Sequence, residues 1–236
     1  MRLIPEHKYM VVVLLHACVS SAFACNEFNE TFEDLEAWEE LTFPNIDRHS
    51  EYSVMQRDGG SALRAESRAS ASGLVSRQSF DVYETPHLGW RWKVDNIYSN
   101  TNVMSREGDD YPIRIYVLFD YDPEDATLGQ RIRYRTARAL HGEYPPHSTL
   151  NYVWSSARET PDIYPSPYTD RSRMIPLRHG SGRVGEWVEE SVHIVDDYRR
   201  AFGEDPPSKA RIAIMNDSDD TGEAAVSWVD WIIVYQ

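Results

Sequence analysis

The stretch Ile113-Arg114-Ile115-Tyr116-Val117-Leu118-Phe119 decides the fold of this 236-residue chain. Ile113, Ile115, Val117 and Phe119 alternate with Arg114, Tyr116 and Leu118. Successive side chains of a β-strand point to opposite faces, so this period of two predicts a strand. One of its faces belongs in a core, and the other carries Arg114 and Tyr116 away from it.

Similar short runs recur along the chain, with Gly, Pro, Asn and Asp between them. Residues 87–94 and 150–154 alternate in the same way, and residues 210–215 and 225–235 are apolar runs near the C-terminus. Many short strands separated by turn residues indicate a sandwich or a barrel. Residues 126–140 and 196–202 have helical patterns. We therefore predict a mainly β fold, an antiparallel β-sandwich with one or two short helices.

The last run, residues 225–235, has apolar side chains on both faces, which predicts a central or covered strand. Strict alternation places Trp228, Asp230, Ile232 and Val234 on one face, and Val229, Trp231, Ile233 and Tyr235 on the other. A carboxylate at Asp230 needs a partner. A first strand near residues 28–32 is expected to pair with this last one.

The N-terminus has the pattern of a secretory signal. An apolar run over residues 10–19 follows a weakly basic start, and Ala22-Phe23-Ala24 supplies the small-x-small pattern that signal peptidase cuts after. The run is too short to span a bilayer. We expect residues 1–24 to be a signal peptide and residues 25–236 to form a single β-sandwich domain. That domain would be periplasmic or anchored to the outer membrane.

Cleavage after Ala24 leaves Cys25 first in the mature chain, where a bacterial lipoprotein carries its lipid anchor. A soluble exported protein that begins with Cys is the alternative, because Ala22 stands where such signals usually have Leu. The other cysteine is Cys18, inside the signal, so the mature chain cannot close an internal disulfide. Export without disulfides fits a bacterial envelope.

The formal net charge of −14 limits the partners of the protein. An acidic surface repels nucleic acid and anionic lipid headgroups. We expect no nucleic-acid partner, and contact with a membrane only through a lipid anchor. Neutral ligands, cations or a basic partner remain.

An acidic loop at residues 216–223 is the first candidate site. It packs four carboxylates into eight residues between two predicted strands. Close carboxylates repel one another, so proteins keep them in solvent, on a cation or around a cationic ligand. Asp217, Asp219 and Glu223 could supply oxygen ligands to calcium, although their spacing is too short for an EF-hand loop. A solvated acidic turn is the alternative.

A polar groove beside the 113–119 strand is the second candidate. Asp109 and Asp110 lead into that strand, and Arg114 faces away from its apolar side. A structural Arg114–Asp pair is the alternative interpretation. Together the two candidates give the expected polar contacts, which are Asp109, Asp110, Arg114, Asn151, Asp217 and Asp219.

Aromatic side chains supply the other half of a possible sugar site. Tyr164 and Tyr168 lie in a proline-rich segment and are expected near the surface, where a sugar ring could stack on them. Packing over the sandwich ends is the alternative. The paired aromatics of residues 90–92 and 152–154 are expected in the core.

Several strings resemble a known family in the same order: WRWKV (90–94), DDYPIRIY (109–116), LNYVWS (150–155) and IAIMNDSDDTGE (212–223). The family consists of uncharacterised bacterial exported proteins and is known only as domain of unknown function 3047. The resemblance covers most of the mature chain and implies no reaction or ligand.

A broader likeness is to galactose-binding-like jelly rolls, through DGGSALRA (58–65) and VDWIIV (229–234). Such modules often bind sugars and often hold a structural calcium ion between their first and last strands. By that analogy, Asp230 with Glu33 or Asp34 would hold calcium, and no other cofactor is expected. Likeness of fold is a poor guide to function.

Three functions remain open from the sequence. The first is an envelope module that binds a glycan or another polar small ligand. The second is a carbohydrate-active hydrolase or lyase in which Asp110 and either Asp217 or Asp219 form an acid/base pair. The third is a structural or assembly protein of the envelope. The nucleophile elbow Gly-x-Ser-x-Gly and the zinc motif His-Glu-x-x-His are absent from the sequence.

Overall fold

The computed structural model describes residues 28–44, 46–99, 102–124, 128, 129, 131, 134, 135 and 144–236. The predicted signal peptide and Cys25 lie outside these residues, as does most of the predicted helix at 126–140. The five described residues of that helix, Leu128, Gly129, Arg131, Tyr134 and Arg135, are α-helical. No helix in the described part of the chain is long and apolar enough to cross a membrane.

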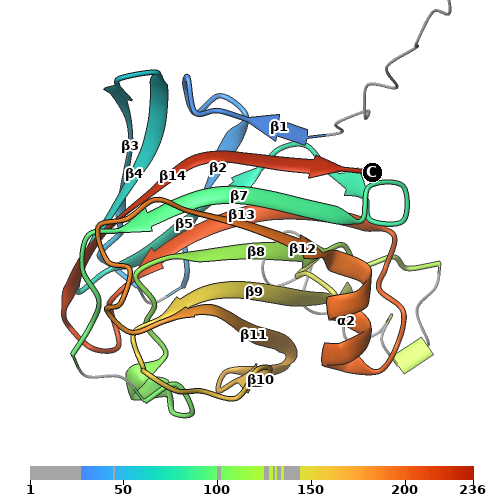
Figure 1. Cartoon of the computed structure of the whole chain (residues 1–236). Coiled ribbons are helices and arrows are strands. Elements are labelled where there is room, and N and C mark those ends of the chain that lie inside the picture. Colours follow the sequence, from blue (N-terminus) through green and yellow to red (C-terminus); the bar gives the residue numbers. More distant parts are fainter. Residues whose placement is uncertain are drawn as a thin grey trace, which may run out of the picture.

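Two β-sheets pack face to face (Figure 1). In sheet A the strand order is β12 (Val188–His193), β7 (His87–Val94), β14 (Ala224–Tyr235), β4 (Gly60–Arg68) and β3 (Glu51–Arg57). The short strand β1 (Phe28–Glu30) pairs antiparallel with β14, which confirms the expected pairing of the first and last strands.

Sheet B forms the second layer. Its order is β10 (Tyr164–Ser166), β11 (Thr169–His179), β9 (Ser148–Ser155), β8 (Arg114–Phe119), β13 (Lys209–Asp217), β5 (Ala71–Ser76) and β2 (Trp38–Leu41). β6 (Phe80–Asp81) pairs with the first two residues of β13, Lys209 and Ala210. The chain passes repeatedly from one sheet to the other, as in a jelly roll, so the predicted mainly β sandwich is confirmed.

One strand pair departs from the antiparallel expectation. Strands β9 and β11 run parallel, whereas the other paired strands of the described chain are antiparallel. The cause is the β10–β11 hairpin. β10 takes the direction opposite to β9 but lies at the sheet edge, so the returning strand β11 enters between them in the direction of β9.

The core between the sheets is rich in aromatic rings, as the sequence predicted. Trp90 and Trp92 of β7 meet Tyr152 and Trp154 of β9, and all four side chains are fully buried. The ring centroids of Trp92 and Trp154 lie 5.9 Å apart. Large rings at period two thus fix which face of each sheet points inward.

The alternation predicted for the last strand is wrong beyond Val229. A β-bulge between Val229 and Trp231 shifts the register of β14 against β7. Val229, Ile232 and Val234 therefore belong to the core, while Asp230 and Trp231 both face outward. A bulge adds one residue to a strand, so a strict period of two fails across it.

Helix α2 (Ile194–Phe202) covers one end of the sandwich (Figure 1) and confirms the predicted helix at 196–202. His193 caps its N-terminus by accepting a hydrogen bond from the Asp196 amide. Gly203 ends it with a φ of 75°, a left-handed conformation that glycine adopts without strain. A 3-10 turn, η1 (Arg106–Gly108), precedes β8.

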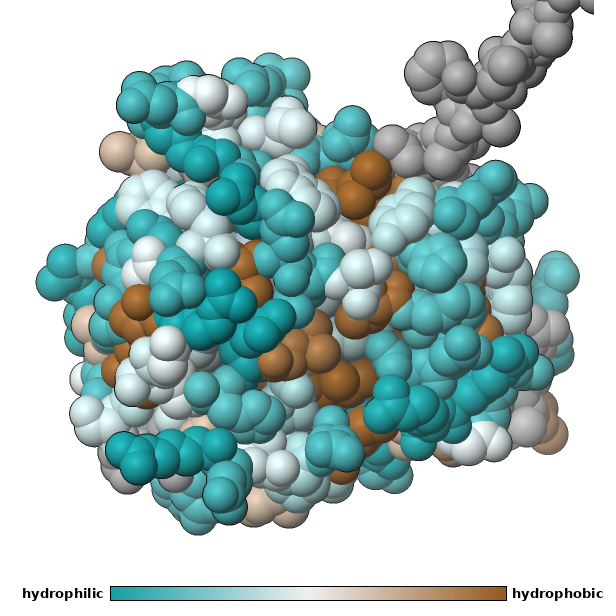
Figure 2. All heavy atoms as spheres, in the orientation of Figure 1, coloured by the Kyte–Doolittle hydropathy of each residue, from teal (hydrophilic) through white to brown (hydrophobic). Residues whose placement is uncertain are grey.

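The molecular face in Figure 2 is mostly hydrophilic, and hydrophobic atoms are visible mainly in small areas near its middle. Scattered apolar atoms of this kind are usual on the surface of folded proteins.

Candidate functional site

The outer face of sheet B forms the floor of the candidate site. Ile113, Ile115 and Val117 fill the core, so Arg114 and Tyr116 project to the other side of the sheet. On the neighbouring strand β13, Met215 lies beside Arg114 and Asp217 follows two residues later. The period-two pattern of β8 predicted this polar face.

A cavity of about 600 Å³ lies over this face. Its strand-borne walls include Ala71, Arg114, Tyr116, Thr149, Ser172, Met174, Met215 and Asp217. Arg171 of β11 and the helical residue Tyr134 also line it, and loops supply most of the rest, including Phe43, Pro44, Ile46, Asp109, Pro145, Pro146, Tyr168, Asp219 and Asp220. Aromatic rings, prolines and charged groups thus line one space.

A buried ion pair stands at the acidic end of the cavity. The Arg114 guanidinium donates two hydrogen bonds to Asp217, one of them from Nε to Oδ1 at 2.9 Å and the other from Nη2 to Oδ2. Nη2 also donates to the Asp109 carbonyl oxygen. Only 4% of Arg114 and 2% of Asp217 is exposed. Such a two-pronged, buried pair fixes both side chains.

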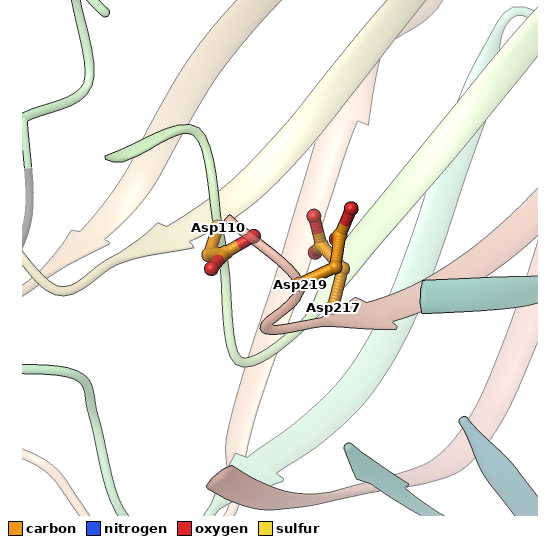
Figure 3. A group of neighbouring side chains, drawn as sticks. All are labelled: Asp110, Asp217 and Asp219. Atoms are coloured by element: carbon orange, nitrogen blue, oxygen red, sulfur yellow. The ribbon is translucent and has the colours of Figure 1, made fainter. Parts of the chain in front are cut away.

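Asp110 holds two loops together. Its Oδ1 accepts a hydrogen bond from the Asp220 amide at 3.3 Å, and its Oδ2 accepts one from the Thr221 amide at 2.6 Å. The loop before β8 is thereby tied to the loop after β13. In Figure 3 the carboxylates of Asp217 and Asp219 extend to the same side, with Asp110 facing them from the other loop. One oxygen of each of the three carboxylates lies within 4.8 Å of the others.

Three carboxylates of the cavity, those of Asp109, Asp219 and Asp220, carry raised pKa values. Burial, with repulsion from Asp220 and Asp110 partly offset by Arg114, raises the pKa of Asp109 to about 6. Burial and then repulsion from Asp110 also raise the pKa of Asp219. The pKa of Asp220 is raised mainly by burial, and its Oδ2 accepts a hydrogen bond of 2.7 Å from the Tyr168 hydroxyl. Negative charge is therefore crowded at this end.

The structure brings together six of the eight residues predicted to bind a ligand. Asp109, Arg114, Tyr168, Asp217 and Asp219 line the cavity, and Asp110 adjoins them through its loop contacts. The sequence predicted only that loops would bring these acidic side chains together; the pairing of β8 with β13 is what places Arg114 beside Asp217.

Asn151 and Tyr164 correct the prediction. Asn151 is fully buried, and its Nδ2 donates to Ser172 Oγ at 2.7 Å, behind the cavity wall. Tyr164 is 2% exposed, and its hydroxyl is bonded to that of Tyr111 at 2.8 Å. Neither side chain offers a free surface, because β11 covers Asn151 and because Tyr164, in β10 itself, packs against Val103, Tyr111 and Val153. The proline-rich composition wrongly suggested exposure for Tyr164, whereas Tyr168 is 51% exposed.

The predicted metal set of Asp230, Glu33 and Asp34 does not assemble. Asp230 instead bonds to Arg57 and, at 2.9 Å, to Arg91. The bulge turns Asp230 outward to these arginines, and Glu33 and Asp34 are exposed in the loop after β1. In the described chain, one group of acidic, His or Cys side chains has the spacing of a metal site, and it is Asp110, Asp217 and Asp219. Calcium binding itself stays a prediction.

Several cavity residues escaped the sequence analysis. Met215 sits two residues before Asp217 on the outer face of β13, so period two could have found it. Phe43, Pro44 and Pro145 reach the cavity from loops, and Tyr134 from a helical segment, all distant in sequence from β8 and β13. Their composition carries no signal for that position, because loop paths depend on the packed sheets beneath.

A family model described as "Protein of unknown function (DUF3047)" matches residues 36–233. That range includes every cavity residue named above. No curated protein matches the chain.

Solved structures of similar architecture include carbohydrate-binding modules. The family 11 carbohydrate-binding module from Clostridium thermocellum, in complex with a β-1,3-1,4-mixed-linked tetrasaccharide, shares 10% identity over 87% of this chain and 92% of that one, with a TM-score of 0.41. The solution structure of CtCBM11 shares 12% over 92% and 97%, with a TM-score of 0.44. Endoglucanase 3 of family GH12 from Trichoderma harzianum shares 9% over 78% and 84%, with a TM-score of 0.39. The cavity must therefore be interpreted from its own residues.

Proposed function

The chain belongs to the family of proteins of unknown function DUF3047, and we propose that it is a binding module whose ligand is a glycan held on the outer face of sheet B. One observation carries the proposal. A single cavity of about 600 Å³ is lined by tyrosine rings and by charged and hydroxyl side chains. Its volume lies in the range of about 300 to 1,000 Å³ usual for small-molecule sites.

The chemistry of the lining suits a sugar. A pyranose ring has apolar C–H faces, which pack on flat rings, and hydroxyl groups at its edge, which need hydrogen-bond partners. Tyr168 offers a half-exposed ring at the rim, and Tyr116 lies on the floor. Ser172, Thr169 and Asp219 supply hydrogen-bonding groups around the same space.

The hydrogen bonds of Asp110 and Asp217 favour binding over hydrolysis. A hydrolase with Asp110 and Asp217 as its acid/base pair needs both groups free to exchange protons. Asp217 instead uses both oxygens on Arg114, and Asp110 uses both on backbone amides. These bonds give the two groups structural tasks.

A glycan array followed by calorimetry tests this proposal. We expect Tyr168→Ala to weaken binding of the best glycan about tenfold, because a stacking ring lost from a rim is worth about 1.4 kcal/mol. Tyr83→Ala is the matched control, since Tyr83 is 48% exposed and lies outside the cavity. An array without any bound glycan, or equal losses in both variants, would sink the proposal.

We also propose export to a bacterial envelope, supported by the signal-like pattern of residues 1–24. Cell fractionation with mass analysis of the mature N-terminus tests it. A lipid-modified Cys25 would place the protein on the membrane, and Cys25→Ser would then release it. A chain that keeps residues 1–24 in the cytoplasm would contradict export.

A further inference from the structure

We propose that the acidic end of the cavity binds a protonated amino group, so that the ligand is a glycan with free amino groups, such as an oligomer of glucosamine. This inference rests on the proposed glycan-binding function and names its substrate class. Three observations support it. The acidic end has more carboxylates than cations, one buried oxygen of Asp109 has no hydrogen-bond partner, and the oxygens of Asp110 and Asp217 are already hydrogen-bonded within the protein.

The charge balance at the acidic end comes first. Asp109, Asp217, Asp219 and Asp220 all line the cavity, and Asp110 adjoins them. Among the described lining residues, two carry guanidinium groups, Arg114 and Arg171. Arg171 bonds to His147 and Glu204, away from the aspartates. Arg114 is therefore the cation that faces the aspartates among the described lining residues. One positive charge stands against several carboxylates, so this end of the cavity is more negative than positive.

An unpaired buried oxygen is the second, independent observation. Asp109 is 3% exposed, and its Oδ1 has no hydrogen-bond partner in the described structure. A buried carboxylate oxygen without a donor is costly. An ammonium group carries three N–H donors and no acceptor. It can satisfy this oxygen and also donate to Asp219 or Asp220 in the same cavity.

The raised pKa values of Asp109, Asp219 and Asp220 agree with this geometry. Burial and mutual repulsion disfavour their charged forms in the free protein. A bound cation would favour those forms again, whereas a neutral hydroxyl group would leave the repulsion in place. These carboxylates are therefore expected to bind a positively charged hydrogen-bond donor more strongly than a neutral hydroxyl group.

An ammonium group fits better than a divalent metal ion. The three carboxylates with metal-like spacing are Asp110, Asp217 and Asp219. Both oxygens of Asp217 face Arg114, and both of Asp110 face backbone amides. A dication there would displace these bonds and lie beside a guanidinium group. Asp109 pairs through Oδ2 with Arg114 Nη1 at 3.7 Å, which leaves its Oδ1, the carboxylate of Asp219 and one oxygen of Asp220 for the amino group of a ligand.

Calorimetry with three matched tetrasaccharides tests the inference. Chains of β-1,4-linked glucosamine, N-acetylglucosamine and glucose differ at C2, which bears an amine, an acetamide or a hydroxyl group. We expect the glucosamine chain to bind at least tenfold tighter, with an affinity that falls as salt is added. Equal or weaker binding of that chain would overturn the inference, while any glycan bound in the cavity would leave the proposed function standing.

Two variants separate the site from general attraction to an acidic protein. Asp219→Asn removes an exposed cavity charge, and Asp58→Asn removes an exposed charge in the β3–β4 turn. We expect Asp219→Asn to lose about tenfold in affinity for the glucosamine chain and Asp58→Asn to lose less than twofold. Equal losses would show non-specific attraction and overturn the inference. Calcium chloride that binds at Asp219 while the glucosamine chain does not would overturn it in favour of a metal site.

Discussion

Charged side chains are paired differently on the outer faces of the two sheets. On sheet A, Arg57 and Arg91 share Asp230, and Lys93 pairs with Asp95 at 2.9 Å. These cations also lie over indole rings; the guanidinium carbon of Arg57, for example, is 4.9 Å from the ring centroid of Trp187. On sheet B, a group of carboxylates surrounds one guanidinium group that is almost fully buried.

The difference shows where a ligand is needed. On sheet A the charges of the partly exposed cations are matched by Asp230, Asp95 and indole rings, although Nε of Arg57 is also a buried donor without a partner. Buried carboxylates in excess of their cations are unfavourable until a donor or a proton arrives. An excess of buried carboxylates over cations in a cavity is therefore better evidence for ligand binding than the same number of charges on an open surface.

The largest effect that separates the two faces is expected for Arg114→Gln. Loss of this buried guanidinium leaves Asp217 charged and without its main partner, which should cost about 3 to 5 kcal/mol in the free energy of unfolding. Urea denaturation at neutral pH measures it.

Arg91→Gln on sheet A is the control. Its side chain is 33% exposed, and Asp230 keeps Arg57 as a partner. We expect a loss below about 1 kcal/mol. Similar losses for the two variants would remove the contrast between the faces.

A smaller and opposite effect is expected for Asp109→Asn. The pKa of this carboxyl is raised from its ordinary 3.8 to about 6 in the folded protein. Its stabilising contribution is thus complete below about pH 4 and is lost as pH rises through 6. At pH 7 the buried charge opposes folding, so the amide should stabilise the protein by about 1 to 3 kcal/mol, and should have little effect at pH 4.

Denaturation of wild type, Asp109→Asn and Asp58→Asn at pH 4 and pH 7 checks the sign. The exposed Asp58 should change stability little at either pH. A gain for Asp109→Asn of the same size at both pH values would show that its charge is not the cause. A loss confined to pH 7 would reverse the proposed role of burial.

Much of the fold could be predicted because it follows from local patterns. Period two in residues 113–119 and 87–94 gave the strands, and the large rings in those runs and in 150–154 gave the core. The helix at 196–202 was recognisable from its charges and from Gly203. The bulge at Asp230 was not, because an extra residue in a strand leaves no mark in the alternation until a partner strand fixes the register.

The candidate site could be predicted only in part. The sequence indicated four of its residues because they are charged and lie in or next to predicted strands: Asp109, Arg114, Asp217 and Asp219. Tyr164 was placed wrongly, since burial of a loop tyrosine depends on how the β10–β11 hairpin folds. Asp230 was assigned to a metal by analogy, although its two arginine partners come from strands distant in sequence.

By itself, the sequence determined the strands, the inward faces of most of them and the excess of negative charge, because these depend on side-chain period and composition. Tertiary structure alone decided which carboxylates received a partner. Arg114 lies 103 positions from Asp217, and pairing across such a separation is fixed by the order and register of strands in a sheet. The unpaired oxygen of Asp109 is a result of that order.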